Sequence, residues 1–256
     1  MRSRAAKIVM ALTAAAATIL ALTLVSNGGS QAQDHLAISS FITAGASKKC
    51  VYTATHSGRK VSLPPAKVNT DVRYTAVLRT NLGNIAIGLN SRAPCTVNSF
   101  VHLAEAGFFN HTQCHRLITA GIYILQCGDP YATARTRLTC SFSLSTGTPG
   151  YEFASENLKG ATYPAGVVAM ANAGTRTSNG SQFFIVYKDS TSGLSPTYTP
   201  FGTVSSGLNI VRNVAQAGYK CQYTLAGGGV PRQKIIINSV TITKGATSTQ
   251  TGVGLD

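Results

Sequence analysis

Residues 108–130 read FFNHTQCHRLITAGIYILQCGDP, and a companion stretch, residues 170–187, reads MANAGTRTSNGSQFFIVY. The first stretch offers one cation, Arg116, beside His115, followed by an apolar run and then Gln126. Neither stretch contains a recognisable nucleophile with its base, a set of metal ligands or a phosphate-binding loop. We therefore interpret the two stretches as walls of one apolar groove that holds a single fixed cation.

The composition favours one mainly β domain. The chain has 256 residues, of which 44% are hydrophobic and 12% charged, which is enough for one domain with a full core and additional tails. Glycine, threonine and serine are frequent, and long runs of Ala, Leu, Glu and Lys are scarce after the N-terminus. This usage is typical of strands and turns.

Residues 1–32 have the features of an export segment. Three cations precede an uncharged apolar run at residues 8–25, and the small-residue sequence SQA follows at residues 30–32. We predict a cleaved signal peptide, with an uncleaved N-terminal membrane anchor as the alternative. Either form places the protein outside the cytoplasm, in the cell envelope or the extracellular medium.

The formal charge is +14, and removal of residues 1–32, with three cations and no acids, would leave 14 − 3 = +11. The cations are scattered, as in Arg59-Lys60 and Arg135/Arg137, and form no dense stripe interleaved with aromatic rings. The pattern therefore argues against nucleic acid as a partner. A basic surface on an exported protein favours solubility and contact with an anionic cell envelope.

Six cysteines permit up to three disulfides in an exported chain. Six cysteines allow 15 pairings, and the sequence alone does not choose among them. Cys127 is expected to pair with a cysteine on a neighbouring strand, either Cys114 or Cys95. No CxxC pattern occurs, so the sequence predicts neither a zinc ribbon nor a thioredoxin-like site, and no metal site. The six cysteines are Cys50, Cys95, Cys114, Cys127, Cys140 and Cys221.

The compact domain is expected to span residues 71–245. Residues 33–70 show no clear period, apart from a short strand at 48–53, and Pro64-Pro65 marks a linker over 57–70. Residues 246–256 are small and polar and are expected to form a frayed tail.

Within the domain, alternating apolar residues at 72–80 and 84–89 predict a β-hairpin. A helix should follow, with one buried face, Thr96 as its N-terminal cap and Gly107 at its end. The residues of that face are Val97, Phe100, Val101 and Ala104.

A second helix is expected at 208–217, ended by Gly218. Further strands are expected at 114–118, 122–126, 166–171, 183–187, 199–204 and 233–244. Seven or eight short strands with two helices favour a closed antiparallel barrel that is capped at its ends.

An ordered set of motifs resembles the cyclophilin family of peptidyl-prolyl cis-trans isomerases. The motifs are TNLGNI at 80–85, AP at 93–94, TVNSF at 96–100, HR at 115–116, QCGDP at 126–130, MANAG at 170–174, GSQFFI at 180–185 and FG at 201–202. The resemblance implies a closed eight-stranded antiparallel barrel with two capping helices. It also implies a monomer that needs no cofactor and acts on proline-containing polypeptides, similar to exported bacterial members.

The resemblance assigns roles to individual residues. Arg116 corresponds to the catalytic arginine, and Gln126 to the glutamine that orients it. Phe183 is assigned to the floor of the proline pocket and Phe184 to the core, since adjacent strand residues face opposite ways. The remaining expected substrate-binding residues are Tyr123, Ile124, Ala171, Asn172, Ala173, Gln182, Leu194 and Tyr198.

This chemistry suits a site with one cation and no nucleophile. Rotation about a peptide C–N bond is opposed by a barrier of about 18–20 kcal/mol, and no covalent bond is made or broken. A donor aimed at the proline nitrogen binds the twisted amide better than the planar one, which is the condition for catalysis. Arg116 suits this role because its planar guanidinium stays charged.

The chain departs from the family pattern in the loop at 131–151, where bulkier and basic residues replace a glycine-rich segment. That change is expected to narrow the neighbouring substrate pocket or to favour acidic residues near the proline. Gly193 stands where some members carry a tryptophan, so weak cyclosporin binding is expected. Two alternatives to an isomerase remain: a module that binds proline segments with little turnover, and an adhesive envelope protein.

Overall fold

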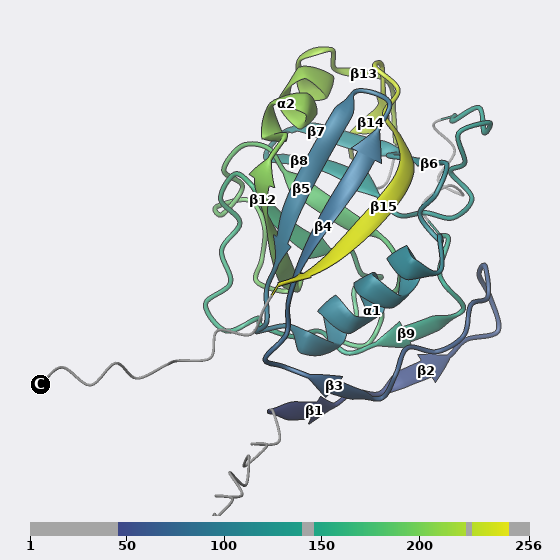
Figure 1. Ribbon diagram of the computed structural model, residues 1–256. Coiled ribbons are helices and arrows are strands. Elements are labelled where there is room, and N and C mark those ends of the chain that lie inside the picture. The colour runs from purple at the N-terminus through teal and green to yellow at the C-terminus, as the bar shows by residue number, and fades with distance from the viewer. Residues whose placement is uncertain (1–45, 140–145, 224–226, 246–256) are drawn as a thin grey trace, which may run out of the picture. The chain divides into compact units, whose positions relative to one another are not determined.

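The computed structural model describes residues 46–139, 146–223 and 227–245 (Figure 1). The predicted signal peptide at 1–32, the tail at 246–256 and Cys140 lie outside the described residues. No helix in the described part is long and apolar enough to cross a membrane.

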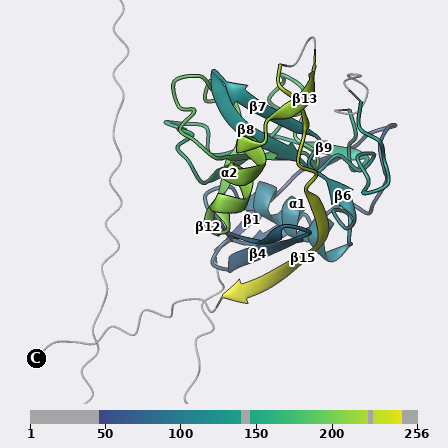
Figure 2. The same ribbon diagram turned by 90° about the horizontal axis from the view of Figure 1, so that it is seen from above.

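The predicted hairpin is present and begins the main sheet. Strands β4 (Arg73–Thr80) and β5 (Gly83–Leu89) pair antiparallel, with Thr80 opposite Gly83 at the turn. Alternate residues of both strands are buried, as their apolar/polar alternation requires. The last strand, β15 (Ile236–Gly245), pairs along the other side of β4 and runs beside it in Figure 2.

The main sheet contains eleven strands in the order β13-β14-β7-β8-β11-β10-β12-β5-β4-β15-β6, and every pair is antiparallel. The remaining strands are β6 (Thr112–Gln113), β7 (Arg116–Ala120), β8 (Ile122–Cys127), β10 (Val167–Met170), β11 (Phe183–Val186), β12 (Pro200–Ser206), β13 (Tyr219–Gln222) and β14 (Gly229–Pro231). The mainly β class with two helices is confirmed. The closed eight-stranded barrel is not confirmed, because the end strands β13 and β6 do not pair with each other among the described residues.

Helix α1 (Pro94–Glu105) buries the predicted face. Its contact residues Val97, Phe100, Val101 and Ala104 are all buried. The prediction that Thr96 caps the helix is wrong, because the helix begins two residues earlier at Pro94. The backbone N–H and the hydroxyl of Thr96 instead donate to the carboxylate of Glu156, at 2.8 and 2.9 Å. Gly107, with φ of +65°, follows the helix as predicted.

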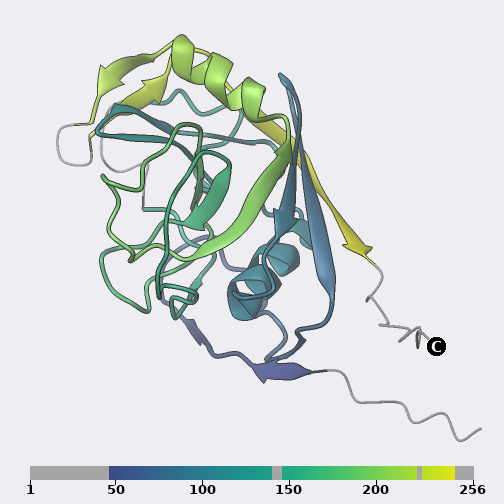
Figure 3. The same cartoon turned by 90° about the vertical axis from the view of Figure 1, so that its left-hand side faces the viewer.

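Helix α2 (Leu208–Gln216) lies toward the other end of the sheet from α1 (Figures 1 and 3). Its apolar side buries Val211 and Val214 against the core. Gly207 precedes it with φ of +86°, and a Cβ there would lie 2.3 Å from the carbonyl oxygen of Asn84. Only glycine, which has no Cβ, lets the backbone at residue 207 come this close to Asn84, so Gly207 sets where the helix starts.

Residues 46–70 form a segment that we call the strap. It contains β1 (Ser47–Lys49), β2 (Tyr52–Ala54) and β3 (Lys67–Asn69). Strand β1 pairs with β3, and β2 pairs with β9 (Tyr151–Phe153), far along the chain. In Figure 3 the strap runs beneath α1. The linker expected at 57–70 is therefore wrong, because the strap is packed on the domain.

Two disulfides are described in full. Cys50 joins Cys95, between the strap and α1, and Cys114, which lies between β6 and β7, joins Cys127 at the end of β8. The second is one of the two pairings expected for Cys127. Cys221 is also disulfide-bonded, and no described cysteine is free. Disulfides of this kind persist in oxidising compartments, which fits an exported protein.

Candidate active site

Arg116 and Gln126 lie opposite each other on neighbouring strands. Arg116 opens β7 and Gln126 lies near the end of β8, and the hairpin between them turns at Gly121. Arg116 Nη1 donates to Gln126 Oε1 at 2.9 Å, and Arg116 Nε donates to the carbonyl oxygen of Gly227 at 3.0 Å. Two contacts of different direction orient the guanidinium plane.

Gln126 is itself oriented by a chain of hydrogen bonds. Its Nε2 donates to Gln182 Oε1 at 2.8 Å, which leaves its own Oε1 to accept from Arg116. Gln182 Nε2 donates to the carbonyl oxygen of Gly147 at 3.0 Å and lies 3.4 Å from Asp129 Oδ2. Both glutamines are buried, so this polar network is held in a place from which water is largely excluded.

The guanidinium of Arg116 is half-buried. Burial lowers its pKa from the ordinary value, and the hydroxyl groups of Tyr198 and Tyr223 oppose that shift. An arginine side chain starts from so high a pKa that it remains a cation at neutral pH. The site thus has the single fixed cation that its sequence suggests.

A cavity of about 520 Å³ lies in front of this cation. Six of the predicted site residues line it: Arg116, Gln126, Ala171, Asn172, Ala173 and Gln182. The cavity is also lined by Thr146, Gly147 and Thr148, which sequence reasoning did not assign to the site. These three belong to the altered loop at 131–151, which the sequence placed beside the substrate pocket without singling out individual residues.

An apolar cluster borders the cavity. It contains Ile124, Phe184 and Leu194 as buried members, with Tyr198 packed against them. The rings of Phe184 and Tyr198 are 5.5 Å apart. Ala171 packs against this cluster and also lines the cavity, so the two adjoin.

The assignment of the two phenylalanines is reversed in the structure. Phe183 packs in the main core against the rings of Phe100, Phe109 and Phe201. Phe184 lies in the apolar cluster beside the groove. The two neighbouring side chains do face opposite ways, but Phe184 and not Phe183 faces the groove. Phe184 shares a strand face with Gln182, two residues earlier, and that spacing was the available signal.

Tyr123 was expected in the groove, and that position is also wrong. Its ring lies 6.0 Å from the ring of Tyr187 and 4.4 Å from Lys188 Nζ, on the opposite face of β8 from Gln126. It lines a second cavity of about 490 Å³. Ile122, one residue earlier, packs against the apolar cluster in its place.

His115 is fully buried next to the cation. Its two ring nitrogens have no hydrogen-bond partner among the described residues. Burial, followed by the charge of Arg116, lowers its pKa to about 3, so it is neutral at physiological pH. Over the described residues, no three His, Cys, Asp or Glu side chains gather in a way that would hold a metal ion.

The basic residues of the altered loop do not face the groove. Arg135 and Arg137 line a separate cavity of about 280 Å³, together with Lys220, Arg232 and Lys234. The expectation that they would border the substrate pocket is therefore wrong. The groove wall is formed instead by the following residues, 146–148.

Residues 75–242 match the family model described as cyclophilin type peptidyl-prolyl cis-trans isomerase. The chain belongs to the cyclophilin family. Among relatives of this cyclophilin, a probable peptidyl-prolyl cis-trans isomerase B from Mycobacterium tuberculosis is 43% identical over 202 residues, covering 71% of this chain. The corresponding protein of Mycobacterium leprae is 42% identical over 212 residues, covering 75% of this chain. The alignments cover 59% and 65% of those relatives' lengths.

Solved cyclophilin structures are similar as well. A cyclophilin type isomerase from Cryptosporidium parvum superposes with a TM-score of 0.54 and 25% identity, covering 68% of this chain and 99% of that one. A structure of the same protein in the presence of the dipeptide Ala-Pro gives a TM-score of 0.53 and 26% identity, covering 66% and 98%. The strap begins before the residues that match the family model.

Proposed function

We propose that this cyclophilin catalyses cis–trans isomerisation of X-Pro peptide bonds and thereby assists the folding of exported proteins. The observation that carries the proposal is the guanidinium of Arg116, held at 2.9 Å by Gln126 beside an apolar cluster. Family membership and the relatives' names support the same activity.

The groove would bind the proline-containing segment of a client polypeptide. Ile124, Phe184, Leu194 and Tyr198 supply an apolar surface for the proline ring. The wall at 171–173, with Gln182, supplies polar groups for the peptide on either side. The related structure in the presence of Ala-Pro supports a proline-containing ligand of this kind.

The reaction needs only rotation about the amide bond. As the bond twists, the proline nitrogen loses conjugation, becomes pyramidal and accepts a hydrogen bond. The cation of Arg116 then interacts more strongly with the twisted state than with the planar one, which lowers the barrier. Gln126 acts as a positioning residue, because it holds the guanidinium in one plane. The apolar cluster reduces competition from water. No cofactor takes part in this scheme.

Export is part of the proposal. The features of residues 1–32 support a signal peptide or an N-terminal anchor, and the disulfides support an oxidising compartment. We propose a monomer that meets its clients in the cell envelope or outside the cell.

Exchange between cis and trans forms of a proline peptide tests the proposal. We expect Arg116→Ala to lower kcat/KM on the order of 10²- to 10³-fold, as for loss of one preorganised donor. Arg116→Lys should recover only a small part, because an ammonium group lacks the planar fork. Arg135→Ala, which removes an arginine from the separate basic cavity, is the matched control and should leave the rate unchanged.

The main alternative is a module that binds proline segments with little turnover. It would be favoured if the wild type accelerates exchange no more than Arg116→Ala while both bind the peptide.

A further role, contact with anionic polymers of the envelope, is favoured by one observation. Five cations surround the 280 Å³ cavity, no carboxylate lines it, and none of the five forms a salt bridge with a described residue.

A further inference from the structure

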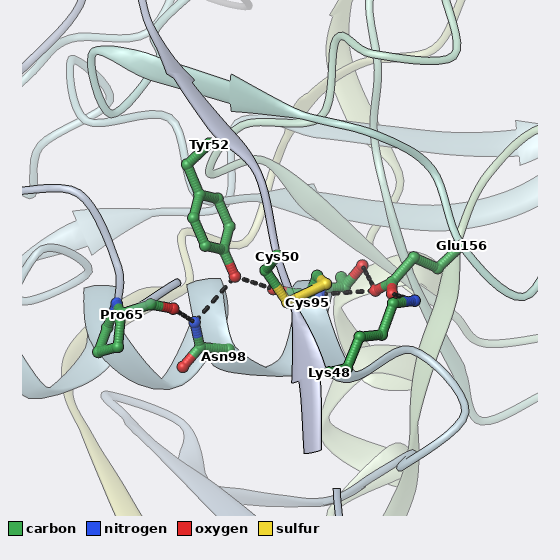
Figure 4. The surroundings of a disulfide bond; sticks show 8 residues. Lys48, Cys50, Tyr52, Pro65, Cys95, Asn98 and Glu156 are labelled. Atoms are coloured by element: carbon green, nitrogen blue, oxygen red, sulfur yellow. Dashed lines mark hydrogen bonds and ion pairs between the residues drawn. A yellow bond between two sulfur atoms is a disulfide. The ribbon is translucent and has the colours of Figure 1, made fainter. Parts of the chain in front are cut away.

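The strap is attached to α1 by a compact set of contacts, shown in Figure 4. The disulfide Cys50–Cys95 links it to the first turn of the helix, and both cysteines are buried. The hydroxyl of Tyr52 donates to the carbonyl oxygen of Cys95 at 2.7 Å. Asn98 Nδ2 donates to that hydroxyl at 2.8 Å and to the carbonyl oxygen of Pro65 at 2.9 Å. Both ends of the strap are thereby held on the helix.

A second anchor joins the strap to the segment after β9. Lys48 Nζ forms a salt bridge of 2.7 Å with Glu156 (Figure 4). The other carboxylate oxygen of Glu156 accepts from Thr96 at the start of α1. Strand β2 pairs with β9 on the same side. The strap is therefore fixed to two parts of the domain that are distant in sequence, α1 and the segment 151–156.

Between these anchors, the strap lies along the loop that forms one wall of the groove. Three backbone N–H groups of the strap donate to carbonyl oxygens of that loop: Thr55 to Gly150 at 2.8 Å, Arg59 to Thr148 at 2.9 Å and Val61 to Pro149 at 3.3 Å. The hydroxyl of Thr148 donates in return to the carbonyl oxygen of Ser57 at 3.3 Å.

This wall belongs to the site. Thr148 and Gly147 line the same 520 Å³ cavity as Arg116. The carbonyl oxygen of Gly147 accepts from Gln182, which also lines the cavity and has a second acceptor, Asp129 Oδ2 at 3.4 Å, that does not depend on the wall. Residues 147–150 are not part of any helix or strand, so the strap provides the backbone pairing that regular structure would provide elsewhere.

We propose that the strap is a specificity-determining element, which keeps the 146–150 wall in place for the client residues that flank the X-Pro pair. The inference rests on the proposed isomerase function. A wall ordered before binding spares the complex the entropy cost of ordering it. The wall contacts the peptide in the planar and twisted states alike, so its loss raises KM and leaves kcat unchanged. A minimal X-Pro dipeptide, which is too short to reach beyond the catalytic pair, is insensitive to it.

Gly58→Ala separates the strap from the wall with a single methyl group. Gly58 has φ of +104°, and a Cβ there would lie 2.2 Å from Thr148 Oγ1 and 2.5 Å from its carbonyl oxygen. The matched control is Gly160→Ala, which also carries a positive φ, +68°, but whose Cβ would meet nothing within 4 Å. The control carries a methyl group at a positive φ without the contact, although +68° lies at the left-handed region that other residues adopt and +104° lies outside it.

The experiment measures exchange kinetics with a six-residue proline peptide and with a blocked X-Pro dipeptide. We expect Gly58→Ala to raise KM for the longer peptide roughly tenfold, the scale of one lost hydrogen-bonded contact, with kcat within about twofold of wild type. The dipeptide kcat/KM should stay within about twofold as well, and Gly160→Ala should match wild type on both substrates.

Equal losses on both peptides, or equal behaviour of the two alanine variants, would overturn the inference. If Gly58→Ala does not fold, the double variant C50S/C95S releases the strap at its disulfide, and the same ratio between peptides is expected. If wild type does not accelerate exchange at all, the proposed function fails. In that case calorimetry measures the Kd of the longer peptide for wild type and for Gly58→Ala. A higher Kd for Gly58→Ala would support the role of the strap, and an equal Kd would overturn it.

Discussion

At the scale of single residues, the neighbours Phe183 and Phe184 show how one strand serves two regions. Phe183 points into the main core, where it contacts three other phenylalanine rings. Phe184 points to the apolar cluster that borders the groove. Adjacent residues of a strand face opposite ways, so the two side chains should affect different properties of the protein.

Leucine substitutions should separate these properties. We expect Phe183→Leu to lower the free energy of unfolding by about 1–3 kcal/mol, with kcat/KM of the folded protein unchanged. Phe184→Leu should lower kcat/KM for a proline peptide by about tenfold or more, because the pocket for the ring loses contact surface. Urea unfolding and the exchange assay check the two effects. A larger loss of activity in Phe183→Leu would restore the original assignment.

His115 should make the folded state sensitive to acid. The unfolded chain takes up a proton on this side chain as the pH falls below 6.5, whereas burial holds its folded-state pKa at about 3. Between these values the unfolded state binds more protons, so stability falls as the pH is lowered. From pH 6.5 to pH 5 the loss from this one group should reach about 2 kcal/mol.

Urea unfolding at pH 7 and pH 5 measures that loss. In His115→Leu, which cannot titrate, the difference between the two pH values should shrink by about 2 kcal/mol. A His115→Leu protein with an unchanged pH dependence would contradict the argument.

At the scale of elements, the parts with a clear period were predicted well. The β4–β5 hairpin alternates, and both helices carry an apolar face, so local sequence was sufficient to identify them. The start of α1 was not predicted correctly, because the carboxylate that serves its first turn comes from Glu156, 60 residues away in sequence. A partner so remote leaves no local pattern.

Short strands were the elements that the sequence did not reveal. Strands β3, β9 and β14, of three residues each, were not predicted, and the single strand expected at 48–53 is instead the two short strands β1 and β2. Three residues are too few to show an alternation. Their extended form is stabilised by pairing with distant segments, as in β2 with β9.

At the scale of the whole molecule, five of the 22 Lys and Arg side chains gather around one cavity, although the cations are scattered along the sequence. Arg135, Arg137, Lys220, Arg232 and Lys234 converge on one cavity from three separate segments. Lys234 Nζ donates to the carbonyl oxygen of Ala134 at 2.5 Å, which ties two of those segments together. The groove with Arg116 is a separate cavity, so the five cations and the proposed catalytic site lie in different places.

That separation predicts the behaviour of the protein on an anionic polymer. We expect retention on a sulfated-polysaccharide column that weakens as salt is raised, because exposed charges are screened. The double variant R135Q/R137Q should elute at distinctly lower salt, whereas Arg116→Ala should elute with wild type. The elution salt concentration is the measurement. A shift for Arg116→Ala as large as for the double variant would contradict separate surfaces.

The amino-acid sequence by itself determined the family, the mainly β class, both helices, and the pair Arg116 and Gln126, because these depend on ordered motifs and local periodicity. The motifs also named Ala171, Asn172, Ala173 and Gln182, which line the same cavity, and tertiary structure decided other features of the site. It selected Phe184 over Phe183 and Ile122 over Tyr123, since the phase of a strand is set by what packs on each face. It also placed the strap against the groove wall, because contacts between residues 55–61 and 148–150 join segments that only folding brings together.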